Sequence, residues 1–143
     1  MAEPRPVRLR VAAAVVRREG RLLLTRRPPG GPLGLYWEFP GGKLESGESA
    51  AGALARELRE ELGVGSRPGA TLAVTRHDYP GGPSVELHFV SCELDSLDFT
   101  PSPAVHEIRW VSPAAVDPAE VLEADRDFLA TLAGATPTEP PRG

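Results

Sequence analysis

Three glutamates near the middle of the chain have the residue type and the spacing to hold a divalent cation. Glu57, Glu60 and Glu61 occupy positions i, i+3 and i+4, which would put three carboxylates on one surface of a helix. Arg56 can offset Glu60 along that helix, but no basic residue in the stretch is placed to neutralise Glu57 and Glu61 together. Two carboxylates about 4 Å apart repel by up to roughly 4 kcal/mol in a partly shielded site. Mg²⁺ or Mn²⁺ would relieve that repulsion, because both ions prefer oxygen ligands.

A helix over residues 49–62 is the element that must position these glutamates. Its apolar residues recur at helical spacing and would form one buried stripe: Ala51, Leu54, Ala55, Leu58 and Leu62. Gly63 follows as the expected C-terminal stop, since glycine adopts the left-handed conformation without a side-chain clash. The helix pattern by itself also fits a second interpretation, in which the glutamates form a solvated acidic face, as charge runs usually do.

A longer pattern around the helix decides between these two interpretations. Gly42 is followed after five residues by Glu48, and after seven more by the run RELREELGV at 56–64. This string resembles the signature of the Nudix hydrolases at every specified position. The resemblance implies a loop–helix–loop that binds divalent metal, with Mg²⁺ or Mn²⁺ as cofactor. It also implies cleavage of a nucleoside diphosphate that is linked to another group.

The resemblance implies roles for individual residues of the motif. Glu57, Glu60 and Glu61 correspond to the metal-binding carboxylates, and Glu61 and the carbonyl group of Gly41 correspond to direct ligands in the MutT-like branch. Gly41 and Gly42 also have a physical reason, because only a residue without a side chain lets the backbone approach phosphate and metal closely.

Other residues of the motif are expected to serve its structure. Glu48 could neutralise Arg56 and fix the loop to the helix, and we rank this salt bridge above direct metal ligation by Glu48. Gly42 and Gly63 belong to the same structural group.

Three glutamates are candidates for the catalytic step: Glu57, Glu60 and Glu107. The general base could be Glu57 or Glu107, since family members often take an outlying glutamate from the later strand. An equal alternative for Glu107 is a surface glutamate beside His106 and Arg109.

Residues before the motif resemble the substrate site of the MutT-like enzymes. Arg27 matches the arginine that contacts the nucleotide in these enzymes, with Arg26 as a close competitor. The run WEFPGGK, which contains Glu38, Phe39 and Gly41, is typical of this branch and assigns these three residues to substrate binding.

The residue expected to read the base is Asp125. The pair Ala124-Asp125 stands where the bacterial 8-oxo-dGTP enzymes have alanine-asparagine, as in family members that prefer cytidine nucleotides. An ionised aspartate only accepts hydrogen bonds, and the cytosine N4 amino group is a donor, but oxidised guanine also offers donors. A plain helix residue near Arg126 is the alternative reading of Asp125.

The expected function is hydrolysis of nucleoside triphosphates to monophosphate and pyrophosphate, as house-cleaning of the nucleotide pool. 8-oxo-dGTP, (d)CTP and 5-methyl-dCTP are the leading substrates that the resemblance suggests. Two alternatives stay open: a pyrophosphatase acting on ADP-ribose or another nucleoside-diphosphate sugar, and a non-catalytic nucleotide sensor. Product analysis separates the first alternative, and absence of turnover despite tight binding would favour the second.

Length and composition fit one soluble globular domain. The 143 residues suffice for one domain, placed at residues 7–133 with flexible tails at 1–6 and 134–143. A net charge of −4 argues against a broad nucleic-acid surface. The single cysteine, Cys92, excludes an intramolecular disulfide.

The resemblance implies a small-molecule nucleotide as the partner, and neither nucleic acid nor membrane is expected. The expected state is a monomer or homodimer. Since no apolar run approaches the length of a membrane span and the N-terminus lacks a signal-peptide core, a cytoplasmic location is expected.

The order of the predicted elements indicates an α/β class, a mixed sheet packed between helices in an α/β/α arrangement. Strands are expected at 7–16, 21–25, 70–76, 84–92 and 105–111, from alternating or continuous apolar residues. A helix start is expected at Ser112-Pro113, and a last helix at about 118–132. The Nudix fold agrees with this order over nearly the whole chain.

Overall fold

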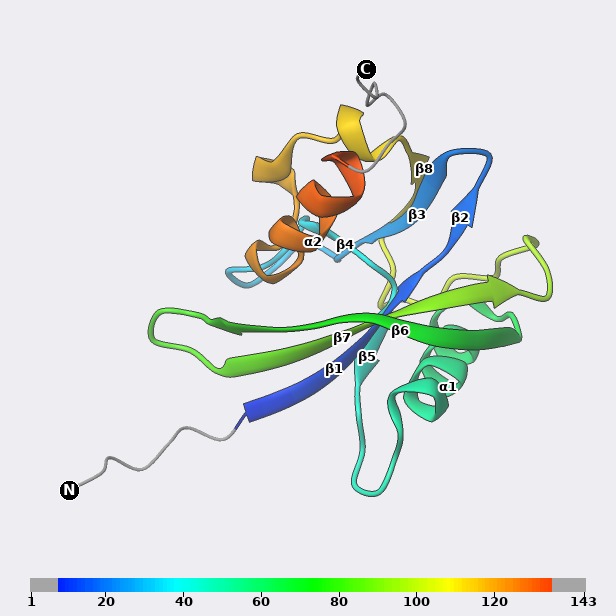
Figure 1. The fold of residues 1–143 in the computed structure, drawn as a ribbon, viewed down its shortest axis with the longest axis horizontal. Helices are drawn as coiled ribbons and strands as arrows, with labels where there is room; N and C mark the ends of the chain where they lie inside the picture. The colour runs from blue at the N-terminus through cyan, green and yellow to red at the C-terminus, as the bar shows by residue number, and fades with distance from the viewer. Residues whose placement is uncertain (1–7, 135–143) are drawn as a thin grey trace, which may run out of the picture.

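Two four-stranded β-sheets and two α-helices form the part of the chain that the computed structural model describes, residues 8–134 (Figure 1). The first sheet has the order β5-β1-β7-β6 and is mixed. Within it, β1 (Arg8–Val15) runs parallel to β7 (Ser84–Leu94). The outer strands β5 (Gly41–Lys43) and β6 (Ser66–Asp78) pair antiparallel with β1 and β7, respectively. The expected class, a mixed sheet packed with helices, is confirmed.

The second sheet is antiparallel and is built around β3 (Arg21–Arg26). This strand pairs with β2 (Arg17–Arg18), with β4 (Trp37–Glu38) and with β8 (Glu107–Val111). Its two longer strands, β3 and β8, agree with the strands expected at 21–25 and 105–111, but the sequence patterns do not indicate β2 and β4, which are only two residues long. Its consequence for the site is that β4 carries residues 37 and 38 toward the glycines of β5.

The second half of β1, residues 12–15, is apolar on both faces because both faces of its sheet are covered there. Ala12 is buried in one hydrophobic core together with α1 (Ala50–Leu62), and Ala13 is buried in the other core together with α2 (Glu123–Gly134). Alternate residues of an extended strand point to opposite faces, so a doubly covered strand has no polar face. Figure 1 shows the two helices on opposite sides of β1, β6 and β7.

The helix α1 begins and ends where its capping residues predict. The side chain of Ser49 accepts a hydrogen bond from the backbone N–H of Gly52, and Gly63 ends the helix at φ 71°, donating its N–H to the carbonyl of Arg59. One detail of the expected stripe is wrong: Ala51 is exposed, because the sheet meets the opposite side of the first turn. The buried residues of the helix are Ala53, Leu54, Leu58 and Leu62.

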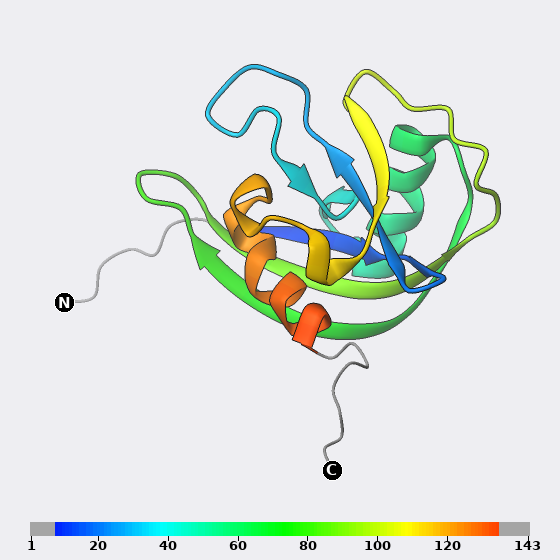
Figure 2. The ribbon, with the colours of Figure 1, turned by 90° about the horizontal axis from the view of Figure 1, so that it is seen from above.

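Among the strands, β6 differs most from its predicted range: it spans Ser66–Asp78, whereas a strand is expected only at 70–76. Its pairing with β7 shifts register between Pro68 and Thr71 and again between Thr71 and Ala73. Such bulges interrupt the alternation of side chains, and the sequence signal is lost where they occur. The hairpin that joins β6 to β7 lies at the same end of the molecule as the loop between β3 and β4 (Figure 2).

The last helix begins later than the expected residue 118. Residues Pro118–Glu120 form a short 3₁₀ helix, η2, and Val121 then turns extended to form a parallel β-bridge with Trp37. The N–H of Leu122 donates to the carbonyl of Trp37 as well. These contacts with β4 compete with helix formation, so α2 starts only after them.

The ends of the expected domain, residues 7–133, lie close to the limits of the described part of the chain. The helix α2 extends to Gly134, and residues 1–7 and 135–143, which include Val7 of the expected domain and nearly all of both expected tails, lie outside the described part. Residues Pro113–Ala115 form a second 3₁₀ helix, η1, but Ser112 makes no side-chain capping bond. Between residues 8 and 134 there is no helix long and apolar enough to cross a membrane.

Candidate active site

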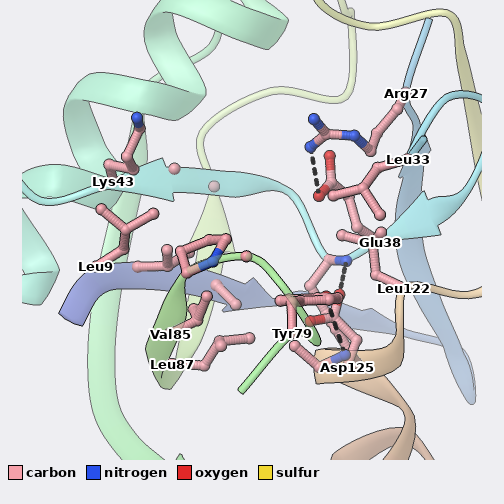
Figure 3. A pocket seen from close by; sticks show the side chains of 18 of the residues that line it. Leu9, Arg27, Leu33, Glu38, Lys43, Tyr79, Val85, Leu87, Leu122 and Asp125 are labelled. Carbon is pink, nitrogen blue, oxygen red and sulfur yellow. Dashed lines mark hydrogen bonds and ion pairs between the residues drawn. The ribbon is translucent and has the colours of Figure 1, made fainter. Parts of the chain in front are cut away.

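A cavity of about 850 Å³ opens where β4, β5, α1 and the start of α2 approach one another. In Figure 3, Arg27 and Glu38 lie above Tyr79 and Asp125, and Lys43 lies on the far side of the cavity. Its polar lining residues come from six segments of the chain: Arg27, Glu38, Lys43, Glu57, Glu61, Tyr79 and Asp125. Leucines and valines of β1 and β7 supply an apolar floor. The cavity therefore combines an acidic end with an apolar compartment.

The two glycines of β5 are required by close approach of the backbone. Gly41 has φ 149°, and a Cβ atom there would overlap the carbonyl oxygen of Ala12 on the neighbouring strand. A Cβ atom on Gly42 would overlap the carboxyl group of Glu57. The absence of side chains thus lets the carboxylate of Glu57 lie directly against the β5 backbone.

Glu57 and Glu61 are brought together in the cavity, one turn apart on α1. Burial, the negative charges of Glu57 and Glu38 and a hydrogen bond with Glu57 together raise the pKa of Glu61 to about 8. Glu60 is placed differently: its side chain is 59% exposed, and its carboxylate lies 3.5 Å from Arg56, outside the cavity lining. The three glutamates of the sequence pattern are therefore divided into an inner pair and an outer residue.

The inner pair fits a hard divalent cation. The charge of Glu57 helps to raise the pKa of Glu61 in this partly buried site, and Mg²⁺ would compensate both carboxylates, because it suits one or two carboxylates with waters and substrate phosphates as its other ligands. Gly41 lines the same cavity, so its backbone is available near the pair. Within residues 8–134, no group of three or more His, Cys, Asp or Glu side chains forms a complete metal site. Substrate oxygens would have to complete it.

Arg56 and Glu48 form the expected structural salt bridge. Arg56 Nε lies 2.8 Å from one carboxylate oxygen of Glu48, and Nη2 lies 2.9 Å from the other. Nη2 also donates to the carbonyl of Lys43, and the backbone N–H of Glu45 donates to Glu48. The hydrogen bonds from Arg56 and Glu45 lower the pKa of Glu48 to about 2. This network ties α1 to the loop that precedes it and so fixes the helix that bears Glu57.

Glu107 is held in an ion-pair network beside the cavity. Its carboxylate accepts hydrogen bonds from Arg109 at 2.8 Å and from Arg26 at 3.1 Å, and both contacts lower its pKa. The two guanidinium groups lie over the ring of Trp37, at 4.7 Å and 5.4 Å from its centroid. Glu107 is not among the cavity-lining residues, so the described geometry favours Glu57 over Glu107 as general base.

The same network separates the two candidate arginines. Arg26 is engaged by Glu107 and donates to the carbonyl of Leu35. Arg27 lines the cavity and lies 3.4 Å from Glu38. Burial raises the pKa of Glu38 to about 7, although Arg27 acts in the opposite direction. Arg27 is accordingly the arginine that can reach a bound ligand.

Asp125 lies at the other end of the cavity and is 3% exposed. Its Oδ2 accepts a hydrogen bond from the backbone N–H of Phe39 at 3.1 Å. Burial raises the pKa of Asp125 to about 8, with the charge of Glu38 as the second cause. Arg126 instead donates to the carbonyl of Val121, so the structure does not support the alternative in which Asp125 is simply paired with Arg126.

Two lining residues were missed by the sequence reasoning. Lys43 places an ammonium group at the acidic end, and its position directly after the two glycines could have indicated that. Tyr79 stands in the β6–β7 turn, and its hydroxyl accepts a hydrogen bond from the N–H of Ala124. The local sequence around Tyr79 does not indicate a contact with a residue 45 positions later in the chain.

The fold, with a cavity whose acidic end is compatible with a divalent cation, is that of a Nudix-type hydrolase, and the family comparison agrees. Residues 6–132 match the NUDIX domain family, so the chain belongs to that family.

Within this family, the chain is similar to characterised nucleotide hydrolases and to a solved structure. The chain is 37% identical over 108 residues to the CTP pyrophosphohydrolase of Escherichia coli, a match that covers 73% of this chain and 76% of that protein. It is 39% identical over 74 residues to the 8-oxo-dGTP diphosphatase of Proteus vulgaris, covering 51% and 66% of the two chains. The solution structure of the E. coli ORF135 protein superimposes with a TM-score of 0.72 at 30% identity, over 92% of this chain and 95% of that one.

Proposed function

We propose that this protein hydrolyses (deoxy)nucleoside triphosphates to a monophosphate and pyrophosphate with Mg²⁺ or Mn²⁺, and so removes unwanted nucleotides from the cytoplasmic pool. The observation that carries the proposal is that one cavity contains the Glu57–Glu61 pair at one end and the buried Asp125 at the other. A triphosphate and a base are the two parts of a ligand that would match these ends. The similarity to a CTP pyrophosphohydrolase and an 8-oxo-dGTP diphosphatase supports the same class.

The acidic end would hold the cation and the phosphates. Glu57 and Glu61 would be its protein carboxylates, with the backbone of Gly41 beside them. When bound, Mg²⁺ neutralises phosphate charge and lowers the pKa of a bound water. Lys43 adds a second cation to this end and can contact phosphate oxygens. Glu57, whose carboxylate lies against Gly42, is the proposed acceptor for the proton of the attacking water.

The apolar end would hold the base. Arg27 and Glu38 flank its entrance, and the floor from β1 and β7 can pack against a flat ring. Asp125 has one oxygen bonded to the Phe39 N–H, which leaves Oδ1 to meet the polar edge of the base. In the ionised form, that oxygen can accept from the amino group that cytosine and 8-oxoguanine both present, so (d)CTP, 5-methyl-dCTP and 8-oxo-dGTP are the leading substrates.

The test is a pyrophosphate-release assay with Mg²⁺ across 8-oxo-dGTP, dGTP, dCTP, 5-methyl-dCTP, CTP and ADP-ribose. The expected result is hydrolysis with a preference for one triphosphate. Chelation of Mg²⁺ and the variant Glu57→Gln should each abolish this hydrolysis. Release of AMP from ADP-ribose with no turnover of any triphosphate would instead establish the sugar-nucleotide reaction. Binding without turnover of any compound would contradict an enzymatic role.

A further inference from the structure

The first turn of α2 receives a cap from a distant part of the chain. A helix leaves its first backbone N–H groups without internal partners, and a polar side chain directly before the helix usually accepts from one of them. Here the preceding residue is Leu122, whose side chain cannot accept a hydrogen bond. The hydroxyl oxygen of Tyr79 accepts from the N–H of Ala124 at 3.3 Å instead. The capping group thus comes from the β6–β7 turn.

Tyr79 is itself held firmly in that turn. Its backbone N–H donates to the carbonyl of Pro83, and its carbonyl accepts from the N–H of Gly82. Its ring meets the ring of His77 edge to face, with centroids 4.5 Å apart. His77 adds a second contact with α2, since its Nε2 lies 3.2 Å from a carboxylate oxygen of Glu123. His77 at the end of β6 and Tyr79 just after it therefore contact two consecutive residues of α2, Glu123 and Ala124.

We propose that Tyr79 is a positioning residue for base selection, which holds Asp125 in place through the backbone of Ala124. The inference rests on the proposed function, in which Asp125 reads the base. Asp125 directly follows Ala124, and its carboxylate is fixed on the other side by the N–H of Phe39. The two contacts link the helix turn to the β6–β7 turn and the carboxylate to the segment after β4. Without the Tyr79 hydroxyl, the first turn can fray and carry Asp125 with it.

Tyr79→Phe isolates this role, because it removes the hydroxyl and keeps the ring that packs beside His77. The chain provides a matched control in its other tyrosine, since the Tyr36 hydroxyl has no hydrogen bond within residues 8–134 and Tyr36 is not a lining residue. For Tyr79→Phe, the ratio of kcat/KM between the best and the worst triphosphate should fall roughly fivefold, the effect of one ordinary hydrogen bond. The fall in kcat/KM should come from a higher KM for the preferred nucleotide. Tyr36→Phe should leave the ratio unchanged.

A double-mutant cycle with Asp125→Asn tests whether Tyr79 acts through Asp125. The effect of Tyr79→Phe on the ratio should disappear in the Asp125→Asn background, since the residue being positioned no longer has its native chemistry. Equal losses for all triphosphates, or full additivity with Asp125→Asn, would overturn the proposal and leave Tyr79 as a residue of general stability.

Amide hydrogen exchange separates this proposal from the proposed function. The Ala124 amide should exchange roughly fivefold faster in Tyr79→Phe than in the wild type, and the change should be absent in Tyr36→Phe. Unchanged protection of Ala124 would refute the positioning role whatever the enzyme hydrolyses. Failure of the wild-type protein to hydrolyse any triphosphate would refute the proposed function, and the exchange result would still decide on the contact.

Discussion

The backbone N–H of Phe39 donates to Oδ2 of Asp125 across 3.1 Å, although the two residues are 86 positions apart. Phe39 directly follows β4 and precedes the glycines of the signature, and Asp125 lies in the first turn of α2. This bond therefore fixes the base end of the cavity relative to the acidic end. It also leaves one carboxyl oxygen of Asp125 free for a ligand, and the chemistry of that oxygen depends on pH.

Base selection should change with pH because the pKa of Asp125 is raised to about 8. Below that pH the carboxyl group is protonated and can donate, and above it the carboxylate can only accept. CTP and UTP differ at this edge by an amino donor and a carbonyl acceptor. The ratio of kcat/KM for CTP to that for UTP should therefore rise roughly fivefold as the pH rises through about 8. The measurement is the two pH profiles side by side.

Asp125→Asn is the control for that profile, because the amide does not titrate and has nearly the same shape. Its CTP/UTP ratio should be flat over the same pH range. A slope equal to that of the wild type would show that another group causes the pH dependence.

Mg²⁺ should stabilise the folded protein through the inner carboxylate pair. A cation at about 100 times its Kd stabilises a native state by about 2.7 kcal/mol, which corresponds to several degrees in Tm for a chain of this length. Glu61→Gln should remove most of this shift, since Glu61 faces Glu57 in the cavity. The measurement is Tm with and without Mg²⁺ by differential scanning calorimetry.

Glu60→Gln is the comparison that the structure supplies for this experiment. Glu60 lies on the outer side of the helix near Arg56, so its variant should keep most of the Mg²⁺ shift. An equal loss in both variants would place Glu60 among the ligands after all, as the resemblance of the motif implies.

The sequence predicts α1 well because its signals are local. Ser49 and Gly63 mark the two ends, and the leucines mark the buried side. The division of the glutamates is not local, because whether a carboxylate faces the cavity depends on where β5 and β4 lie. The contrast between Glu60 and Glu61, which are adjacent in sequence and differ in burial, follows from tertiary packing alone.

The short strands β2 and β4 of the second sheet and the start of α2 could not be predicted from the sequence for a related reason. Strands of two residues carry no usable alternation, and β4 exists because β3 offers it a partner. The delayed start of α2 reflects the contacts of Val121 and Leu122 with Trp37. Long-range pairing of this kind sets the geometry of the base end, where the sequence could identify Asp125 but not its bond to Phe39.

The salt bridge between Glu48 and Arg56 should contribute stability that is lost in acid. Contacts with Arg56 and Glu45 lower the pKa of Glu48 from 4.5 to about 2. A carboxyl group with a lowered folded-state pKa stabilises the fold above its unfolded pKa, and this contribution disappears as the pH falls toward 2. Glu48→Gln should therefore lower Tm at neutral pH, and the difference from the wild type should shrink as the pH falls below about 4.5.

Glu45→Gln provides the matched glutamate for this comparison. Its side chain is 69% exposed and lies 3.7 Å from Arg56, so its loss should cost little at any pH. The measurement is Tm as a function of pH, from neutral pH into the acid range, for both variants and the wild type. A Tm difference between Glu48→Gln and the wild type that stays constant with pH would contradict the prediction.

Gly42→Ala should impair activity more than stability. The new methyl group would overlap the carboxyl group of Glu57, and the flexible glutamate can swing away more easily than the β5 backbone can move. The fold then survives at the expense of the position of Glu57, and a misplacement of about 1 Å can cost about 10²-fold in rate. Gly134→Ala is the control, because a Cβ atom at the end of α2 meets nothing within 4 Å. kcat and Tm should be measured for both variants, with a fall in kcat at nearly constant Tm expected for Gly42→Ala alone. If Gly42→Ala instead lost Tm in proportion to kcat, the glycine would serve the folding of β5 and not the placement of Glu57.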